Sequence, residues 1–374
     1  MHVRNASRLT VPFPQKFSLI DNPVEFLAFL KSYRSQISKP YVRVLHFDCS
    51  KCESIGLDAQ AIVDAFLQEE MRRRKDQDYI VGGAFPQDVR LKTMLKAIGT
   101  LRMLNHPEMH LPDGIEARIE RCDMLYGNGK RIKASAARDR AGTGLVNYFG
   151  RVLAHQGFDL TYEGRAFLTS LLTEVIGNAE EHSGRWYAIG YSYPTVTERE
   201  ADELEECQIV MFNFGKTIHE SLSARSASAS VKERVESLIE HHRRSNHFNE
   251  RWKEECLWTV CALQQGVSRY KEGERGITRG NGTVEMIRAF SALAGDPQKM
   301  CLVSGNTYIL FDGTYELSKR SSGVSQIAFN ESNDLKVAPD PEHVFWMPER
   351  FPGTVISLRF SISASQLQER QNGK

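Results

Sequence analysis

The sequence predicts an α+β protein that is divided into two domains. Strand and helix signals alternate through the first hundred residues, which is typical of a small α/β layer. After residue 160 a long amphipathic helix is followed by a buried strand and by two glycine clusters. The length of 374 residues leaves room for two domains, and the hydrophobic content of 41% is ordinary for a packed chain.

The first hundred residues contain three strand signals and three helix signals. Apolar and β-branched runs that are bounded by turn residues indicate the strands, and apolar residues at helical spacing indicate the helices. Gly56 and the pair Gly82-Gly83 separate successive elements. The expected elements are, in order, a strand at 11–19, a helix at 22–33, a strand at 42–47, a helix at 57–67, a strand at 79–81 and a helix at 89–104.

The charge balance excludes some classes of function. Lys and Arg number 48 and Asp and Glu number 47, so the formal net charge of +1 creates no global field for long phosphate polymers or an anionic membrane. The sequence has no run of about 18 apolar residues and no apolar leader. We therefore expect a cytoplasmic protein with neither a nucleic-acid partner nor a membrane partner.

Two short patterns have the appearance of metal sites. Cys49 and Cys52 have the spacing of a zinc knuckle, but no second pair or histidine follows at the usual distance. The seven cysteines are irregularly spaced, which predicts reduced thiols. His241, His242 and His247 lie close together, and the arginines between them favour a solvated helix face over a metal site.

The long helix after residue 160 places polar side chains beside an apolar arc. Glu174, Asn178, Glu181 and His182 lie on the arc next to the apolar one. Carboxylate and amide oxygens are ligands that Mg²⁺ shares with phosphate oxygens. The apolar arc consists of Leu168, Leu171, Leu172, Val175, Ile176 and Ala179.

The elements that follow this helix add a polar strand end and two glycine-containing turns. The expected strand 208–212 ends in Asn213 and Gly215, and a glycine cluster at 276–282 precedes an expected helix at 284–293. Glycines before a helix allow the backbone to approach a phosphate closely. The spacing is neither that of a P-loop nor that of a dinucleotide fingerprint.

Together these motifs resemble the ATP-binding domain of the GHKL family, which includes gyrase B, heat-shock chaperones, histidine kinases, MutL and the related anti-sigma-factor kinases. The segment 173–183 is similar to the family's N box, and 213–215 stands at the place of its Asp-x-Gly motif. The glycines at 276–282 and the Gly353-Thr354 pair stand where the second glycine box and the closing strand occur. The resemblance implies a two-layer α/β sandwich, the Bergerat-type fold, that binds ATP and Mg²⁺ and has a lid at 217–275.

The resemblance also implies a role for each matching residue. Asn178 would coordinate Mg²⁺, and Glu174 would be the general base for the attacking water. Asn213 would accept a hydrogen bond from the adenine amino group; the family has Asp there, and a neutral amide would weaken the bond by about 1–2 kcal/mol. The other expected nucleotide-binding residues are His182, Gly215, Lys216, Gly276, Arg279, Gly280, Gly282, Thr283 and Thr354.

The N-terminal layer resembles a STAS domain, the module of anti-sigma-factor antagonists. The strand, the loop with Ser54 and Gly56, and the following helix match the segment that carries a phosphorylatable serine in that family. Glu53 replaces the aspartate that precedes this serine, so a docking layer without phosphorylation is the alternative. The expected organisation is a STAS-like domain at 1–110, a linker or basic arm at 111–144, the GHKL-type domain at 145–363 and a polar tail at 364–374.

The arrangement of these parts decides between kinds of ATP-using proteins. A histidine kinase needs a phosphoacceptor hairpin, and the sequence matches such a hairpin poorly. A gyrase-type protein needs a transducer domain after the ATP site, and we expect no room for one. The leading hypothesis is a Mg-ATP-binding regulatory protein, an ATPase or Ser/Thr kinase, whose lid closure controls a protein partner in signalling or defence. The alternatives are a non-enzymatic scaffold with a degenerate nucleotide site and a chaperone-like ATPase that acts as a homodimer.

Overall fold

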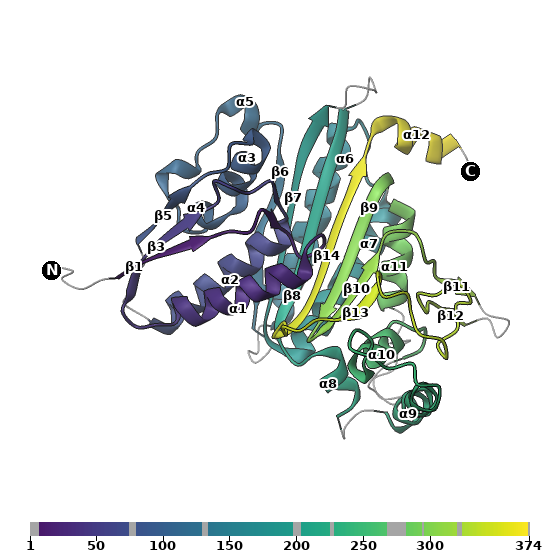
Figure 1. The fold of residues 1–374 in the computed structure, drawn as a ribbon. Coiled ribbons are helices and arrows are strands. Elements are labelled where there is room, and N and C mark those ends of the chain that lie inside the picture. The colour runs from purple at the N-terminus through teal and green to yellow at the C-terminus, as the bar shows by residue number, and fades with distance from the viewer. Residues whose placement is uncertain are drawn as a thin grey trace. The chain divides into compact units, whose positions relative to one another are not determined.

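The protein has a mixed α+β fold, as the sequence predicts, and its chain divides into two compact units. The computed structural model in Figure 1 describes residues 7–74, 80–128, 134–196, 203–224, 228–267, 282–293, 295–319 and 324–372. The first unit comprises Met1–Met124 together with Ile189–Tyr193. The second comprises Leu125–Ala188 and Pro194–Lys374.

The first unit contains a three-stranded parallel sheet with the order β1-β3-β5. Helices α1 and α2 connect the strands, and the aromatic rings of Phe13, Phe17, Phe29 and Phe47 pack together in the core. The short strands β2 and β4 form a separate parallel pair. The bounds are β1 Ser7–Pro12, β2 Lys16–Phe17, α1 Pro23–Ile37, β3 Val42–Asp48, β4 Ser54–Ile55, α2 Leu57–Arg74 and β5 Ile80–Ala84.

The helix expected at 89–104 is two helices. Asp88 caps α3 (Val89–Ile98) by accepting hydrogen bonds from the backbone N–H groups of residues 90 and 91, and α4 is Thr100–Met103. Gly99 separates the two helices in an extended conformation with ψ of −165°. A Cβ at this residue would lie 2.6 Å from the carbonyl oxygen of Leu95, so the break requires glycine. Further along lie the short helices η1 Pro107–Met109 and α5 Asp113–Glu116.

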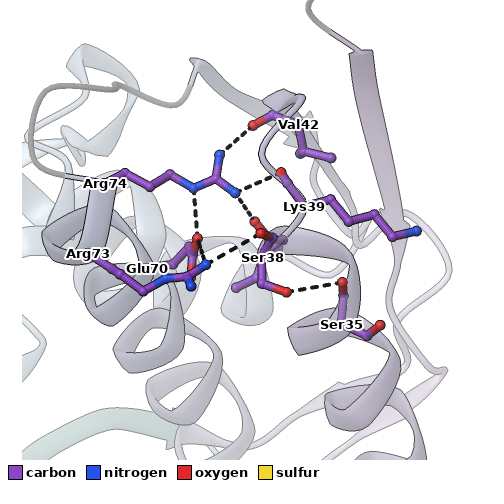
Figure 2. Close-up of polar contacts among 8 residues, drawn as sticks. Ser35, Ser38, Lys39, Val42, Glu70, Arg73 and Arg74 are labelled. Atoms are coloured by element: carbon purple, nitrogen blue, oxygen red, sulfur yellow. Dashed lines mark hydrogen bonds and ion pairs between the residues drawn. The ribbon is translucent and has the colours of Figure 1, made fainter.

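A buried arginine joins the end of α2 to the turn between α1 and β3 (Figure 2). Arg74 donates to the carbonyl oxygens of Ile37, Lys39 and Val42 at 2.6, 2.8 and 2.9 Å. Its Nε lies 2.7 Å from Glu70 Oε1, and both side chains are less than 10% exposed. Arg74 thereby satisfies the Ile37 carbonyl at the end of α1 and connects it with the Val42 carbonyl at the start of β3.

The larger sheet has seven strands in the order β13-β10-β9-β14-β8-β7-β6, and its residues belong to the second unit except for 120–124 in β6 and 189–193 in β7. β14 lies in the middle and pairs antiparallel with β8 and with β9. The strands are β6 Glu120–Gly127, β7 Ser183–Val196, β8 Glu203–Gly215, β9 Gly295–Ser304, β10 Thr307–Phe311, β13 Val344–Trp346 and β14 Gly353–Ile362, and β11 Ser318–Lys319 and β12 Ser325–Gln326 form a separate pair.

Three helices pack against β8 and β14 of this sheet (Figure 1). They are α6 Ala134–His155, α7 Tyr162–His182 and α11 Gly282–Leu293. Side chains from all three line an apolar interior together with residues of the two strands. The remaining helices of the unit are α8 Ile218–Leu222, α9 Ala229–Arg244, α10 Glu254–Ala262 and α12 Ala364–Asn372.

The segments that we expected as linker and tail contain regular structure. The segment 111–144, which we expected to be a linker or basic arm, includes β6 and the first half of α6. The basic part of this segment forms a helix because it is rich in alanine, which has the highest helix propensity. The tail at 364–374 includes α12, which begins with a capping box: the Ser363 hydroxyl accepts from the Gln366 N–H, and Gln366 Oε1 accepts from the Ser363 N–H. Among the described residues, no helix combines the length and apolar character that a membrane span requires.

Candidate functional site

Helix α7 buries the apolar arc that the sequence predicts except at Ala179, which is half-buried. Leu168, Leu171, Leu172, Val175 and Ile176 are each less than 9% exposed. On the polar side Asn178 is exposed and Glu174 and Glu181 are half-buried, whereas the side chain of His182 lies outside what the structure describes. A polar edge that includes the proposed Mg²⁺ ligand and general base therefore borders the packed face of α7.

Helix α6 contacts α7 near this polar edge. A Cβ at Gly142 would lie 2.8 Å from Thr173 Oγ1, so glycine is what permits the two helices to approach so closely. One turn away, Arg138 lies 3.6 Å from Glu180 on α7. Both contacts lie between α6 and α7 close to the polar edge of α7.

Asn213 connects the end of α7 with the centre of the sheet. It is 2% exposed, its Nδ2 donates to the Ala179 carbonyl at 3.2 Å, and its Oδ1 accepts from the Thr354 N–H at 2.8 Å. Ala179 is one of the last four residues of α7, whose carbonyls have no partner within the helix. We refer to Ala179, Asn213, Ser304 and Thr354 as the junction.

The junction explains why asparagine is compatible with this position. A carboxylate has no N–H to donate to the Ala179 carbonyl, whereas an amide donates there and accepts from Thr354. The amide thus has a partner at each end without any ligand. One acceptor position on Oδ1 and one N–H on Nδ2 are left for other partners.

Ser304 is a member of the junction that sequence analysis missed. Its hydroxyl accepts from the Ile218 N–H at 2.8 Å and lies 2.9 Å from Thr354 Oγ1. The signal in the sequence is a polar residue directly after the apolar run at 300–303. Ser304 is fully buried and links the start of α8 to β14.

Two glycines of the predicted motifs bring strands β8 and β14 together. A Cβ at Gly353 would lie 2.0 Å from the Asn213 carbonyl oxygen, so only glycine fits at this position, which pairs with Phe214. The Gly215 N–H donates to the Pro352 carbonyl at 3.0 Å. Gly215 and Lys216 are exposed at the end of β8, where a charged ligand group can reach them.

The second glycine cluster is described only at its end. Gly276, Arg279 and Gly280 lie outside the described residues, and Gly282 and Thr283 form the first turn of α11. The side chains of α11 and α7 line the same apolar interior. The end of this cluster therefore opens a helix that packs beside the N-box-like helix.

Within the expected lid at 217–275 the apolar spacing predicts helices at 231–242 and 252–263, and the structure has α9 and α10 there. Thr217 begins the segment with a capping box on α8, and α9 and α10 follow. In α10, Glu255 accepts from the Asn306 N–H at 2.9 Å, and after it Gln264 donates to the Ile327 carbonyl at 2.9 Å. These described parts of the lid are thus hydrogen-bonded to residues 305–335.

The histidine cluster packs around an aromatic side chain. His242 is buried, its Nε2 lies 2.9 Å from the Leu335 carbonyl, and its Nδ1 faces Trp252 Nε1 and His247 Nδ1 at 3.4 and 3.2 Å. The expected solvated face is therefore wrong for His242. Among the described residues no group of three His, Cys, Asp or Glu side chains has a geometry suited to a metal ion, and Cys49 and Cys52 are buried free thiols.

Comparisons with known proteins give no relative. No protein-family model matches the sequence, and neither a curated protein nor a solved structure matches the chain.

Proposed function

We propose that the second unit binds Mg-ATP and that the protein is a regulatory ATPase or Ser/Thr kinase whose lid movement at 217–275 controls a protein partner. The observation that carries the proposal is the junction, because it joins the N-box-like helix, the strand end at Asn213 and the Gly-Thr strand. Asn213 and Thr354 are 141 residues apart in sequence and are direct partners in the sheet. Residues from three of the four predicted motifs thus surround one hydrogen-bonded centre.

In this proposal the seven-stranded sheet and helices α6, α7 and α11 are the two layers of a GHKL-type sandwich, and the first unit is a STAS-like domain. Asn178 would hold Mg²⁺, and exposed Lys216 would neutralise phosphate charge. The remaining acceptor position on Asn213 Oδ1 would receive the adenine amino group. Lid closure that displaces α10 has to break the hydrogen bonds from Glu255 to Asn306 and from Gln264 to Ile327.

Replacing Glu174 by alanine tests the catalytic part of the proposal. If Glu174 is the general base, the Glu174→Ala variant should retain ATP affinity while its turnover falls by about a hundredfold or more. Glu181→Ala is the matched control, since it removes the same charge from the same helix and should leave turnover unchanged. Both rates are measured as phosphate release at saturating ATP. Equal rates for the two variants would remove Glu174 from the mechanism.

A non-enzymatic scaffold is the second candidate. It is favoured by the observation that the Asn213 amide has a partner at each end, so the junction is complete without nucleotide. A scaffold should capture its protein partner equally well with and without ATP. A partner complex whose affinity changes with ATP supports the regulatory proposal instead.

A further inference from the structure

Strand β5 forms one edge of the three-stranded sheet in the first unit (Figure 1). Among the described elements it pairs only with β3, and its glycines Gly82 and Gly83 are exposed. The Ala84 carbonyl accepts from the Cys49 N–H at 2.9 Å, so Ala84 directs its backbone groups toward β3. Successive residues of a strand direct these groups to opposite sides, so those of Val81 and Gly83 are directed away from β3. This edge can therefore pair with a further strand.

A cavity of about 190 Å³ lies beside this edge. Its wall includes the five consecutive residues 81–85 and apolar side chains such as those of Phe47 and Leu95. Gly83 pairs with Phe47 and lies on the same face of the sheet, but a Cβ at Gly83 would lie 2.2 Å from the Phe47 carbonyl oxygen. The residue must be glycine, so β5 contributes no side chain there. An apolar cavity of about 150 Å³ accommodates a benzene ring, so this cavity has room for one aromatic side chain.

A strand that pairs with β5 would direct one of its own side chains toward the cavity. Directly opposed residues of neighbouring strands have their side chains on the same face, so the residue opposite Gly83 would lie on the face of Phe47. Every second residue of the added strand returns to this face. The residue two positions further along would therefore lie opposite Phe85, whose ring lines the cavity.

Two lysines surround the second of these positions. The ammonium groups of Lys92 and Lys96 on α3 lie 5.5 and 5.7 Å from the centre of the Phe85 ring. Among the described residues no carboxylate forms an ion pair with either ammonium group, and none of the described residues that line the cavity has a carboxylate. Asp48 follows Phe47 in β3 and so alternates to the opposite face of the sheet. The surface beside Phe85 is thus complementary to a carboxylate of a partner.

We propose that the β5 edge binds an extended peptide of a partner protein as a fourth strand. The peptide has an aromatic residue opposite Gly83 and an acidic residue two positions away, so that its ring enters the cavity and its carboxylate faces Lys92 and Lys96. The sequence of β5, Ile-Val-Gly-Gly-Ala, has neither an aromatic nor an acidic side chain, so β5 of a second copy lacks both features. The cavity lies within the first unit and has no part in the proposed ATP site.

The test is a calorimetric titration of the full chain with the acetylated and amidated peptide Thr-Glu-Thr-Phe-Thr-Glu-Thr. Its glutamates lie two positions from the phenylalanine on both sides, so it can pair in either strand direction. We expect saturable binding that weakens by about tenfold or more when alanine replaces the phenylalanine. A peptide with methylated backbone nitrogens keeps every side chain but cannot donate to β5, and it should show no detectable binding. The methyl NMR signals of Val81 and Leu101, which line the cavity, should shift as the unmodified peptide saturates the chain.

Reversal of the lysine charges tests the electrostatic part of the proposal. Lys92→Glu combined with Lys96→Glu should weaken binding by about tenfold or more, and a peptide with lysine in place of both glutamates should bind this variant better than the natural chain. Lys92 is exposed and Lys96 is half-buried, so the fold should tolerate both changes. Lys16→Glu combined with Lys39→Glu is the matched control, since it changes the charge equally at exposed residues that do not line the cavity, and it should bind the peptide normally.

Four outcomes would overturn the proposal. The first is the lack of saturable binding of the unmodified peptide. The second is equal affinity of the methylated peptide, since binding would then not depend on strand pairing. The third is equal affinity of the two double lysine variants. The fourth is a mass of the free chain in sedimentation that rises with concentration and falls when the peptide is added, since a second copy would then occupy the edge. The peptide variants leave the protein unchanged, so the test remains decisive even if a lysine variant does not fold.

Discussion

Replacing Arg74 by alanine is expected to lower the unfolding free energy of the first unit by about 2–4 kcal/mol, because the substitution removes several hydrogen bonds from one charged donor. The substitution removes the donor that Arg74 gives to the carbonyls of Ile37, Lys39 and Val42, and it leaves Glu70 paired with Arg73 alone (Figure 2). Ile37, Val42 and the Glu70 side chain are buried, so bulk water does not replace the lost hydrogen bonds there. Arg74→Lys should lose an intermediate amount, because an ammonium group cannot reproduce the planar set of donors.

The matched control is Arg72→Ala, two residues earlier on α2. Arg72 is 33% exposed and its pair with Glu69 should contribute less than about 1 kcal/mol. All four tryptophans lie in the second unit, so the first unit is best followed by hydrogen exchange of peptides from residues 7–74 as urea is increased. Similar losses for Arg74→Ala and Arg72→Ala would contradict the assigned role of Arg74.

The second large effect is a dependence of stability on pH that comes from Asp64. Burial raises the pKa of Asp64 from its ordinary value of 3.8 to about 7, against the opposing effect of the hydrogen bonds from Thr100 and Gln60. Between these two pH values the folded state holds a proton that the unfolded chain releases. The stabilisation is therefore complete below about pH 4 and is lost as the pH rises to about 7, a difference of about 4 kcal/mol.

Asp64→Asn should remove this dependence, since asparagine does not titrate. The variant is expected to be more stable than the natural chain at pH 8 and to differ less from it at pH 5. Asp58→Asn, on the same helix, is the contrasting variant. The Asp58 carboxylate accepts hydrogen bonds from the backbone N–H groups of Leu19 and Ile20, and an amide would lose part of this hydrogen bonding. The unfolding free energy at each pH is measured by urea unfolding, followed by hydrogen exchange with a correction for pH. If Asp64→Asn leaves the dependence of this free energy on pH unchanged, Asp64 is not its source.

Local sequence patterns predicted the elements but not all of their ends. The helical spacing in α2 and α7 and the apolar runs in β3 and β8 depend on neighbouring residues, and they appear where periodicity placed them. The single helix expected at 89–104 was wrong at Gly99, where a close contact with the Leu95 carbonyl requires glycine. The basic stretch within 111–144, for which charge predicts an arm, forms part of α6 because its alanines have a high helix propensity.

The candidate sites depend on contacts between distant residues, which the sequence shows only in part. The motifs singled out Asn213 and Thr354, but their direct pairing and the bond to Ala179 follow from the sheet order. The signal for Ser304 was too weak to single it out, because a single polar residue after an apolar run is common. Only the fold shows that its hydroxyl contacts Ile218 and Thr354.

The central claim is that the second unit binds Mg-ATP, and calorimetric titration of the full chain with ATP tests it most directly. We predict saturable binding that becomes tighter when Mg²⁺ is added, and an Asn178→Ala variant that binds ATP with the same affinity in the presence and absence of Mg²⁺. Asn178 is exposed, so its replacement should leave the fold intact. No detectable heat of binding at millimolar ATP with Mg²⁺ would contradict the account.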